Sequence, residues 1–425
     1  MKTFTGIIIF LFLLISLQVP SSAPVQARMN STHRMYFSLP RIPLDKTIIS
    51  LLEARQWNSA LEKLTAVTQN TNSDPALHYY VSYCYYELGK QSFDRNNHAH
   101  AAMMFQQALE YSDDVAILHL SLGLSRMKSF EYEAAEHAMT EAVRLDPNSY
   151  PAYRNLGEIQ YMQNDMESAL NSWNRALEID DSDKMLQKRV TALKKQLELT
   201  QHFDIESDYH FNIRFDGDAV PELKHSLPEM LDDIYYRIGD QLNAYPNRQI
   251  AVVLLSREDF VDVTQMPEWV SGIFEGQIKV PVGGNTDPSS LKTILTHEYV
   301  HAVIFDMMSD RCPLWLNEGL AQYFSEKNAD KREKIKNAAA WIRNEAVPDL
   351  PNLFSSGIRS NAGQARKAYA LALSAVDYLI EAIDLYNLQL ILEKMKFGST
   401  FEHALKSVTE YSFSEFQSNW TASVR

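Results

Sequence analysis

Two histidines of the chain, His297 and His301, stand four positions apart, and Glu298 follows the first of them. Residues four apart lie on the same face of an α-helix, so both imidazoles can reach a single metal ion. Ile294, Ile304 and neighbouring apolar residues share or border this face, which predicts a partly dry surround for the pair. The spacing therefore predicts a helix that presents two metal ligands.

A carboxylate that can complete the site follows in the next predicted helix. This helix begins at Pro313 and carries Glu318 within its first two turns. Two histidines and one glutamate leave the fourth position of a tetrahedral zinc ion open for water, as a catalytic site requires. Cys312 is not expected to bind the ion, because it would fill the position that water needs.

The segments HEYVH at residues 297–301 and WLNEGLAQY at residues 315–323 resemble the gluzincin metallopeptidases, particularly the aminopeptidase N type. More widely, residues 204–425 look like the compact peptidase domains of that superfamily that are joined to tetratricopeptide repeats in bacteria. The resemblance implies that His297, His301 and Glu318 bind one Zn²⁺. It also implies that Glu298 is the general base that takes a proton from zinc-bound water, whose pKa the metal lowers to roughly 7.

The resemblance further implies a hydrogen-bond donor to the oxyanion that forms during peptide hydrolysis, often a tyrosine on a later helix. Tyr369 is the best placed candidate by family position, and Tyr378 is the second. The chain has 21 tyrosines, so a packed helix residue is the alternative interpretation of Tyr369.

Two features depart from the family pattern. The interval between His301 and Glu318 is shorter than in the large gluzincins, and Ser325 stands where aminopeptidases have an acid that orients a ligand imidazole. Three side chains are candidates for this orienting role: Asn317, Asp306 and Glu326.

The elements that must position these residues begin after residue 200. The pattern predicts a strand over Tyr209–Phe215, a helix over Val220–Leu242 and an apolar strand over Ile250–Leu255. Asp287 followed by Pro288 predicts the start of the helix that carries the histidines. This part of the chain is predicted to be an α+β domain with a small sheet.

A hairpin is predicted between Ile273 and Ile278, with Glu275-Gly276 as its turn. The same residues faintly resemble the aminopeptidase loop whose glutamate binds a substrate's free amine. The strand from Gln277 to Val282 is expected to be the sheet edge that pairs with substrate backbone, which would suit an endopeptidase.

An internal repeat precedes this domain, with a constant period of 34 residues. Four columns agree across three units: Leu88-Gly89, Leu122-Gly123 and Leu156-Gly157; Ala101, Ala135 and Ala169; Phe105, Met139 and Trp173; Ala108, Ala142 and Ala176. The pattern resembles the tetratricopeptide repeat, in which small residues let two antiparallel helices approach closely. A degenerate unit at residues 47–70 and a closing helix at residues 182–199 are expected to cap the array.

The sequence thus predicts a mostly α fold, with a tetratricopeptide-type solenoid before a gluzincin-like domain. The predicted divisions are a signal peptide (1–27), a linker (28–46), the repeat domain (47–200) and the peptidase domain (201–425). The repeat resemblance implies a groove that binds an extended peptide or a partner helix. A spacer that only supports the next domain is an equal alternative.

Composition and the N-terminus restrict location and partners. The net charge of -14 argues against nucleic-acid binding, which depends on Lys and Arg patches. Lys2, the apolar run Ile7–Leu17 and Val25-Gln26-Ala27 are typical of a signal peptide, so a periplasmic or secreted protein is predicted. Membrane contact is expected only if the segment at residues 7–19 stays uncleaved. Two cysteines, Cys84 and Cys312, are predicted to be free thiols.

Two functions fit these observations. The first is an exported zinc peptidase, more an endopeptidase than an aminopeptidase, whose repeats recruit a protein substrate or partner. The second is a non-catalytic scaffold, or an envelope assembly or chaperone protein, with a vestigial peptidase fold. Retention of both histidines, Glu298 and Glu318 favours the enzyme.

Overall fold

The computed structural model describes residue 40 and residues 42–70, 75–217, 221–283, 286–344, 349–354 and 362–423. The predicted signal peptide and most of the predicted linker lie outside these residues. The described chain forms two compact units, and the division falls between Lys194 and Lys195, inside helix α9 (Lys184–Thr200). We call them the repeat unit and the C-terminal unit.

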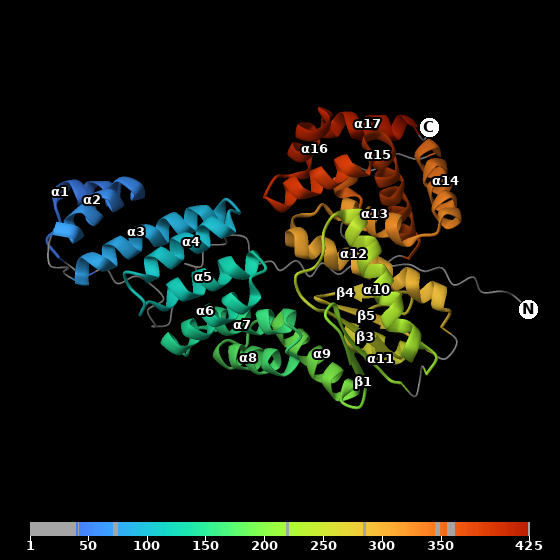
Figure 1. Cartoon of the computed structure of the whole chain (residues 1–425), viewed down its shortest axis with the longest axis horizontal. Helices are drawn as coiled ribbons and strands as arrows, with labels where there is room; N and C mark the ends of the chain where they lie inside the picture. Colours follow the sequence, from blue (N-terminus) through green and yellow to red (C-terminus); the bar gives the residue numbers. More distant parts are fainter. Residues whose placement is uncertain are drawn as a thin grey trace, which may run out of the picture. The chain divides into compact units, whose positions relative to one another are not determined.

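The repeat unit is a stack of helices that pack in successive pairs (Figure 1). Before α9 these helices are α1 (Lys46–Glu53), α2 (Trp57–Asn70), α3 (Pro75–Asp94), α4 (His98–Leu109), α5 (Ala116–Lys128), α6 (Tyr132–Leu145), α7 (Tyr150–Met162) and α8 (Met166–Ile179). The Leu-Gly pairs lie on α3, α5 and α7, and the small residues of the repeat lie on α4, α6 and α8. The predicted solenoid is confirmed, and α1 with α2 forms the degenerate first pair.

The constant spacing of the repeat has a steric cause, because each repeat glycine lies against the large apolar residue of its partner helix. A Cβ added at the glycine would lie 2.6 Å from Phe105 at Gly89, 3.0 Å from Met139 at Gly123 and 2.4 Å from Trp173 at Gly157. All three large residues are buried, as are the six repeat alanines. A side chain at the glycine position would force the two helices of a pair apart.

This packing predicts that Gly157→Ala destabilises the repeat unit by about 1–3 kcal/mol, because the rigid Trp173 ring cannot yield to the new methyl group. Gly123→Ala is the matched control. Its methyl group would meet the flexible Met139 side chain, so the gain in helix propensity, about 1 kcal/mol, should offset most of the strain. Calorimetry of the full chain measures both; equal destabilisation by the two substitutions would contradict this account.

Helix α9 closes the repeat unit, as predicted. The Asp183 carboxylate accepts hydrogen bonds from the backbone N–H groups of Met185 and Leu186 and so caps its first turn. Leu186 and Val190 are buried on its inner side. After Lys194 the helix continues into the C-terminal unit, where Leu199 packs against a small apolar cluster.

The C-terminal unit contains one five-stranded sheet in the order β1-β2-β3-β5-β4. Its strands are β1 (Asp204–Ser207), β2 (Phe211–Phe215), β3 (Ile250–Leu255), β4 (Ile273–Phe274) and β5 (Gln277–Pro281). The central strands β2, β3 and β5 are parallel, and the outer strands β1 and β4 are antiparallel to their neighbours. Strand β3 has the predicted bounds, β2 is shorter than predicted, and β1 was not predicted.

One expectation about the sheet is wrong. The strand at Gln277–Pro281 is not an edge, because β5 lies between β3 and β4. The edge strand at this side is the two-residue β4. The hairpin itself is confirmed: Ile273 pairs with Lys279 and Phe274 with Ile278, around the predicted turn.

The two faces of the sheet bury different residues. On one face Val252, Ile278 and Val280 pack in the main core with α10 (Leu223–Leu242) and α12 (Pro288–Met308). On the other face Val253 and Leu255 pack with α11 (Arg257–Thr264). The alternation follows from the period of two along a strand.

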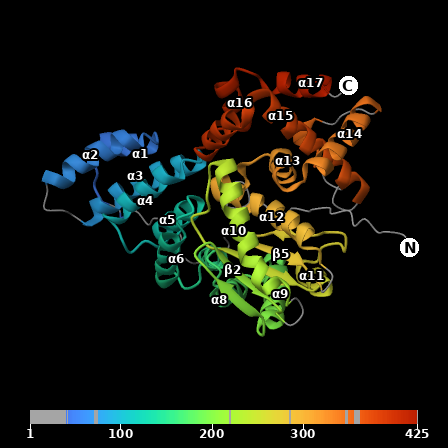
Figure 2. The ribbon, with the colours of Figure 1, turned by 45° about the vertical axis from the view of Figure 1, so that its right-hand side comes forward.

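The remaining helices gather beyond α12, away from the sheet (Figures 1 and 2). They are the 3₁₀ turns η2 (Ser309–Arg311) and η3 (Leu350–Asn352) and the helices α13 (Leu314–Ser325), α14 (Asn328–Asn344), α15 (Ala362–Lys396), α16 (Phe401–Thr409) and α17 (Phe413–Ser423). Helix α12 therefore lies between the sheet and these helices and is covered on several sides.

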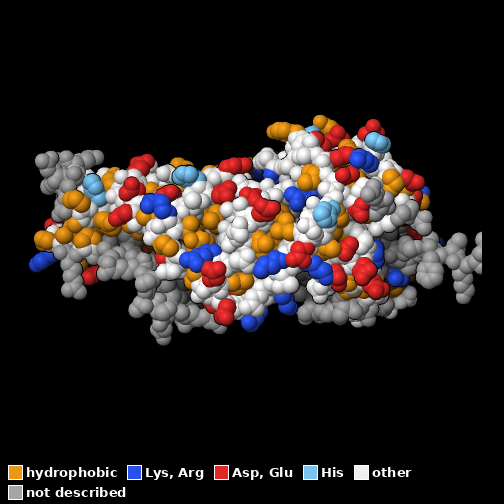
Figure 3. Space-filling model, turned by 90° about the horizontal axis from the view of Figure 1, so that it is seen from below, with side chains coloured by type: hydrophobic (Ala, Val, Ile, Leu, Met, Phe, Trp, Pro, Cys, Tyr) orange, Lys and Arg blue, Asp and Glu red, His pale blue; other side chains and the backbone are white. Residues whose placement is uncertain are grey.

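Charged side chains of both signs are mixed on the surface that Figure 3 draws, with Lys and Arg interspersed among Asp and Glu. Within the described residues, no helix combines the length and the apolar character needed to cross a bilayer. Cys84 and Cys312 are buried free thiols, as predicted.

Candidate metal centre

Helix α12 places His297, Glu298 and His301 in the interior. Asp287 caps the helix by accepting a hydrogen bond from the Ser290 backbone N–H, and Pro288 occupies its first turn. All residues from Ile294 to Ile304 are buried, so the helix is enclosed on every side at the level of the histidines. The three polar side chains are 0% exposed.

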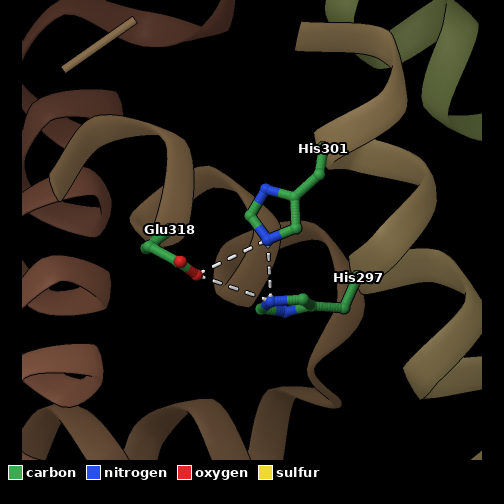
Figure 4. Close-up of side chains that lie close together, drawn as sticks. All are labelled: His297, His301 and Glu318. Atoms are coloured by element: carbon green, nitrogen blue, oxygen red, sulfur yellow. Dashed lines mark hydrogen bonds and ion pairs between the residues drawn. The ribbon is translucent and has the colours of Figure 1, made fainter. Parts of the chain in front are cut away.

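Helix α13 brings Glu318 to the same place. Its close approach to α15 depends on Gly319, where an added Cβ would lie 2.6 Å from the backbone oxygen of Ala372. Glu318, the preceding residue, is 1% exposed and its carboxylate points towards the two imidazoles (Figure 4). The structure thus brings together the three predicted ligands from two adjacent helices.

The three candidate ligand atoms form a nearly equilateral triangle. Nε2 of His297 and Nε2 of His301 are 3.1 Å apart, and Oε2 of Glu318 lies 3.6 Å and 3.5 Å from them, respectively. A tetrahedron with Zn–N and Zn–O bonds of about 2.0–2.1 Å has edges of about 3.3–3.4 Å. The donor set and the spacing therefore fit a zinc ion, and this group is the one possible metal cluster among the described residues.

The electrostatics of the site also suit metal binding. Burial lowers the pKa of His297 to about 3, so its imidazole is neutral at physiological pH. Burial alone would raise the pKa of Glu318, but His301 and His297 outweigh it and lower that pKa below its ordinary value. A neutral imidazole and an ionised carboxylate are the forms that bind a metal.

Asn317 orients one of the imidazoles. Its Oδ1 lies 2.9 Å from Nδ1 of His301, and its side chain is buried. An acceptor at Nδ1 places the proton there and leaves the lone pair of Nε2 facing the other two ligand atoms. The other two candidates for this role are engaged elsewhere, since Asp306 pairs with Arg248 and Glu326 with Lys334.

Asn317→Ala should therefore lower zinc affinity about 10–100-fold, because the His301 ring loses the partner that fixes its tautomer and orientation. Asn317→Asp retains an acceptor and is expected to bind zinc at least as well as the natural residue. Competition with a chromophoric chelator measures both constants. Wild-type affinity in the alanine variant would show that the contact is incidental.

Glu298 is buried beside the start of the edge strand. A Cβ added at Gly272 would lie 2.9 Å from its Oε1, so only glycine leaves room for the carboxylate there. Neither carboxylate oxygen makes a hydrogen bond of good geometry with the described residues. Burial, followed by the charge of Glu318, raises the pKa of Glu298 well above its ordinary value, and the backbone N–H of Phe274 opposes the shift. A raised pKa suits a group that must take up a proton.

The two tyrosine candidates lie on α15 in packed surroundings. Tyr369 is 6% exposed and packs with Ala365, Trp269 and Phe354, its ring centroid 5.4 Å from that of Phe354. Tyr378 packs against Phe416 in the main core, with a centroid distance of 6.0 Å. Trp269 precedes β4 in the chain, so Tyr369 borders the segment that leads to the edge strand. Its role as oxyanion donor stays a prediction.

The hairpin glutamate has a structural partner. Oε2 of Glu275 lies 3.7 Å from Nζ of Lys279, the third residue of β5. This contact agrees with the interpretation of residues 272–276 as a hairpin turn. It leaves the amine-binding interpretation of Glu275 without support from the geometry.

Two sequence families match parts of the chain. The Peptidase MA superfamily matches residues 261–425, which include His297, His301 and Glu318. A tetratricopeptide repeat family matches residues 120–184. The chain therefore carries a Peptidase MA superfamily domain after tetratricopeptide repeats, in agreement with this part of the expected resemblance.

The similarity to individual proteins covers only part of the chain. The chloroplastic tetratricopeptide repeat domain-containing protein PYG7 of Arabidopsis thaliana is 28% identical over 118 residues, which are 27% of this chain and 39% of that protein. The first repeat domain of Spaghetti (RPAP3) bound to an HSP90 peptide is 16% identical, with a TM-score of 0.27, over 28% of this chain and 93% of that one. The MamA crystal structure is also 16% identical, with a TM-score of 0.29, over 37% and 86%. Likenesses of this size carry no conclusion about function.

Proposed function

We propose that the chain is an exported zinc metallopeptidase that hydrolyses peptide bonds. The observation that carries the proposal is the buried triangle of two imidazole nitrogens and one carboxylate oxygen, with edges of 3.1–3.6 Å. Three protein ligands leave one position of a tetrahedral ion for water. The match to the Peptidase MA superfamily supports the same reaction class.

Each side chain of the site has a part in this reaction. His297, His301 and Glu318 would hold Zn²⁺, which when bound acidifies water and polarises a carbonyl oxygen. The Glu298 carboxylate accepts the proton of the attacking water and later donates it to the leaving amine. Asn317 keeps His301 in the tautomer whose Nε2 can bind metal. We assign the oxyanion hydrogen bond to Tyr369.

The edge strand supplies a place for an extended substrate. Strand β4 contacts α12 and, among the described strands, pairs with β5 alone at the end of the sheet. We infer that an extended peptide adds to the sheet along this end. Binding through main-chain hydrogen bonds does not need a free amino terminus. Together with the Glu275–Lys279 contact, this favours an endopeptidase over an aminopeptidase.

The repeats and the N-terminal segment complete the proposal. Tetratricopeptide repeats bind protein segments in other proteins, so the repeat unit here would recruit a protein substrate or partner. Residues 1–27 would act as a signal peptide, which implies a periplasmic or secreted enzyme. Membrane contact would follow only if residues 7–19 were retained as an anchor.

A cleavage assay tests the proposal. Purified full chain should cleave casein, lose activity with a zinc chelator and regain it when stoichiometric zinc is returned. A peptide with a blocked amino terminus should be cut as fast as the unblocked peptide. Zinc bound at one per chain without cleavage of either substrate would favour the non-catalytic scaffold. Cleavage of the unblocked peptide alone would indicate an aminopeptidase.

A further inference from the structure

Arg248 connects two parts of the C-terminal unit that flank the metal site. It lies just before β3, and its side chain is 10% exposed. Its Nε donates to Oδ1 of Asp306 at 3.1 Å, and its Nη1 donates to the backbone oxygen of Gly276 at 3.3 Å. Asp306 belongs to α12, the helix that carries the histidines, and Gly276 belongs to the turn between β4 and β5.

The position of this hairpin over α12 matters for the site. Gly272 lies against the Glu298 carboxylate, and the Phe274 ring packs on Phe305 of α12 with a centroid distance of 5.7 Å. Strand β4 has only two residues and two ladder partners, so its own pairing holds it weakly. The Arg248 bridge fixes the turn end of the hairpin to the histidine helix.

We propose that Arg248 is a positioning residue. It fixes the distance between strand β4 and the side chains of Glu298 and the metal ligands, and thereby the affinity for extended peptides. The inference rests on the proposed peptidase function. Arginine suits the task because its planar group can donate in two directions at once, to a carboxylate and to a carbonyl. Lysine has a single nitrogen and cannot reproduce both contacts with the same geometry.

Three conservative variants test the contacts that Arg248 makes with Asp306 and Gly276. Arg248→Lys retains a positive charge beside Asp306 but loses the fork that also reaches Gly276. Asp306→Asn keeps an acceptor for Arg248 but leaves its buried charge without a counter-ion, so it weakens the other end of the same bridge. Arg311→Lys removes a comparable clamp, which holds the Met308 and Lys396 carbonyls and does not touch the hairpin.

We expect Arg248→Lys to raise KM for extended peptides about tenfold, to change kcat less than threefold and to leave zinc at one per chain. A variant shows this pattern when it loses binding energy that is the same in the ground state and the transition state, provided that chemistry is slower than substrate release. Amide hydrogen exchange at residues 273–281 should accelerate about tenfold in this variant. Asp306→Asn should change both measurements in the same direction as Arg248→Lys. Arg311→Lys, the matched control, should stay within about twofold of wild type in both.

The exchange measurement needs no activity, so it decides the proposal even if the wild-type chain cleaves nothing. If Arg248→Lys does not fold, the double variant Arg248→Met with Asp306→Leu takes its place, since it removes both charges of the buried pair together. Wild-type exchange and KM in a folded Arg248 variant would overturn the proposal. So would an equal rise of KM in Arg311→Lys, which would indicate a general packing defect.

Discussion

Glu298→Gln is expected to lower peptide cleavage about 10²–10⁴-fold and to leave one zinc per chain. The amide keeps the volume of the carboxylate and fits the same space beside Gly272. The amide cannot accept a proton from water at the metal. Glu298 is buried beside the two histidines but is not one of the three candidate ligands, so its replacement should spare the metal. Steady-state cleavage of a quenched fluorescent peptide and metal analysis of the same preparation measure the two quantities.

Glu275→Gln is the matched control for this substitution. It makes the same chemical change in the hairpin next to the site. There the Glu275 carboxylate lies 3.7 Å from Nζ of Lys279. Cleavage of an amino-terminally blocked peptide should stay within about twofold of wild type in this variant. If Glu298→Gln cleaves as fast as Glu275→Gln, another group is the base and the assignment of Glu298 fails.

The parts of the fold that the sequence predicts correctly depend on contacts close in the chain. The 34-residue period predicts the helix pairs because each glycine and the large residue it meets are 16 positions apart in adjacent helices, as with Gly157 and Trp173. The ligand helix is predicted for the same reason: its cap and both histidines lie within one continuous segment. Local spacing is enough to place such groups on a shared face.

The parts that the sequence does not predict depend on long-range pairing. Strand order places β5 inside the sheet, although β4, the true edge, precedes it by only a short turn. Strand β1 pairs with β2 at an exposed edge and lacks a continuous apolar pattern, so its sequence carries little strand signal. Strand order depends on which strands form hydrogen bonds with one another, and the hydrophobic pattern within one strand does not specify its partner.

In the metal site, too, local spacing is predictable from the sequence and long-range packing is not. The sequence identifies the three ligands by type and spacing, but it leaves the orienting role open among Asn317, Asp306 and Glu326. The choice depends on which side chain of α13 faces Nδ1 of His301, and this is a property of the packing between α12 and α13. Arg248 was not singled out, because its partners lie 58 and 28 positions away in the chain.

Glu318→Gln should abolish tight zinc binding and, with it, peptide cleavage. Zinc sites with four protein ligands gain about 10–16 kcal/mol on binding, so one ligand contributes about 3 kcal/mol and its loss costs about 10²-fold in affinity. The amide fills the same volume between the imidazoles of His297 and His301, so the apo chain should still fold. Isothermal titration with zinc measures the affinity directly.

A thermal shift measures the same effect independently of activity. At a free zinc concentration of about 100 times the wild-type dissociation constant, binding stabilises the folded wild type by about 2.7 kcal/mol, and Tm should rise by about 5–10 °C. The Glu318→Gln variant has a dissociation constant close to that zinc concentration, so its Tm should rise by only about 1 °C. Ser325→Ala, a substitution at the far end of α13, should keep the full wild-type shift. A full shift in Glu318→Gln would show that the carboxylate is not a ligand, and the two imidazoles alone would leave hydrolysis without its metal site.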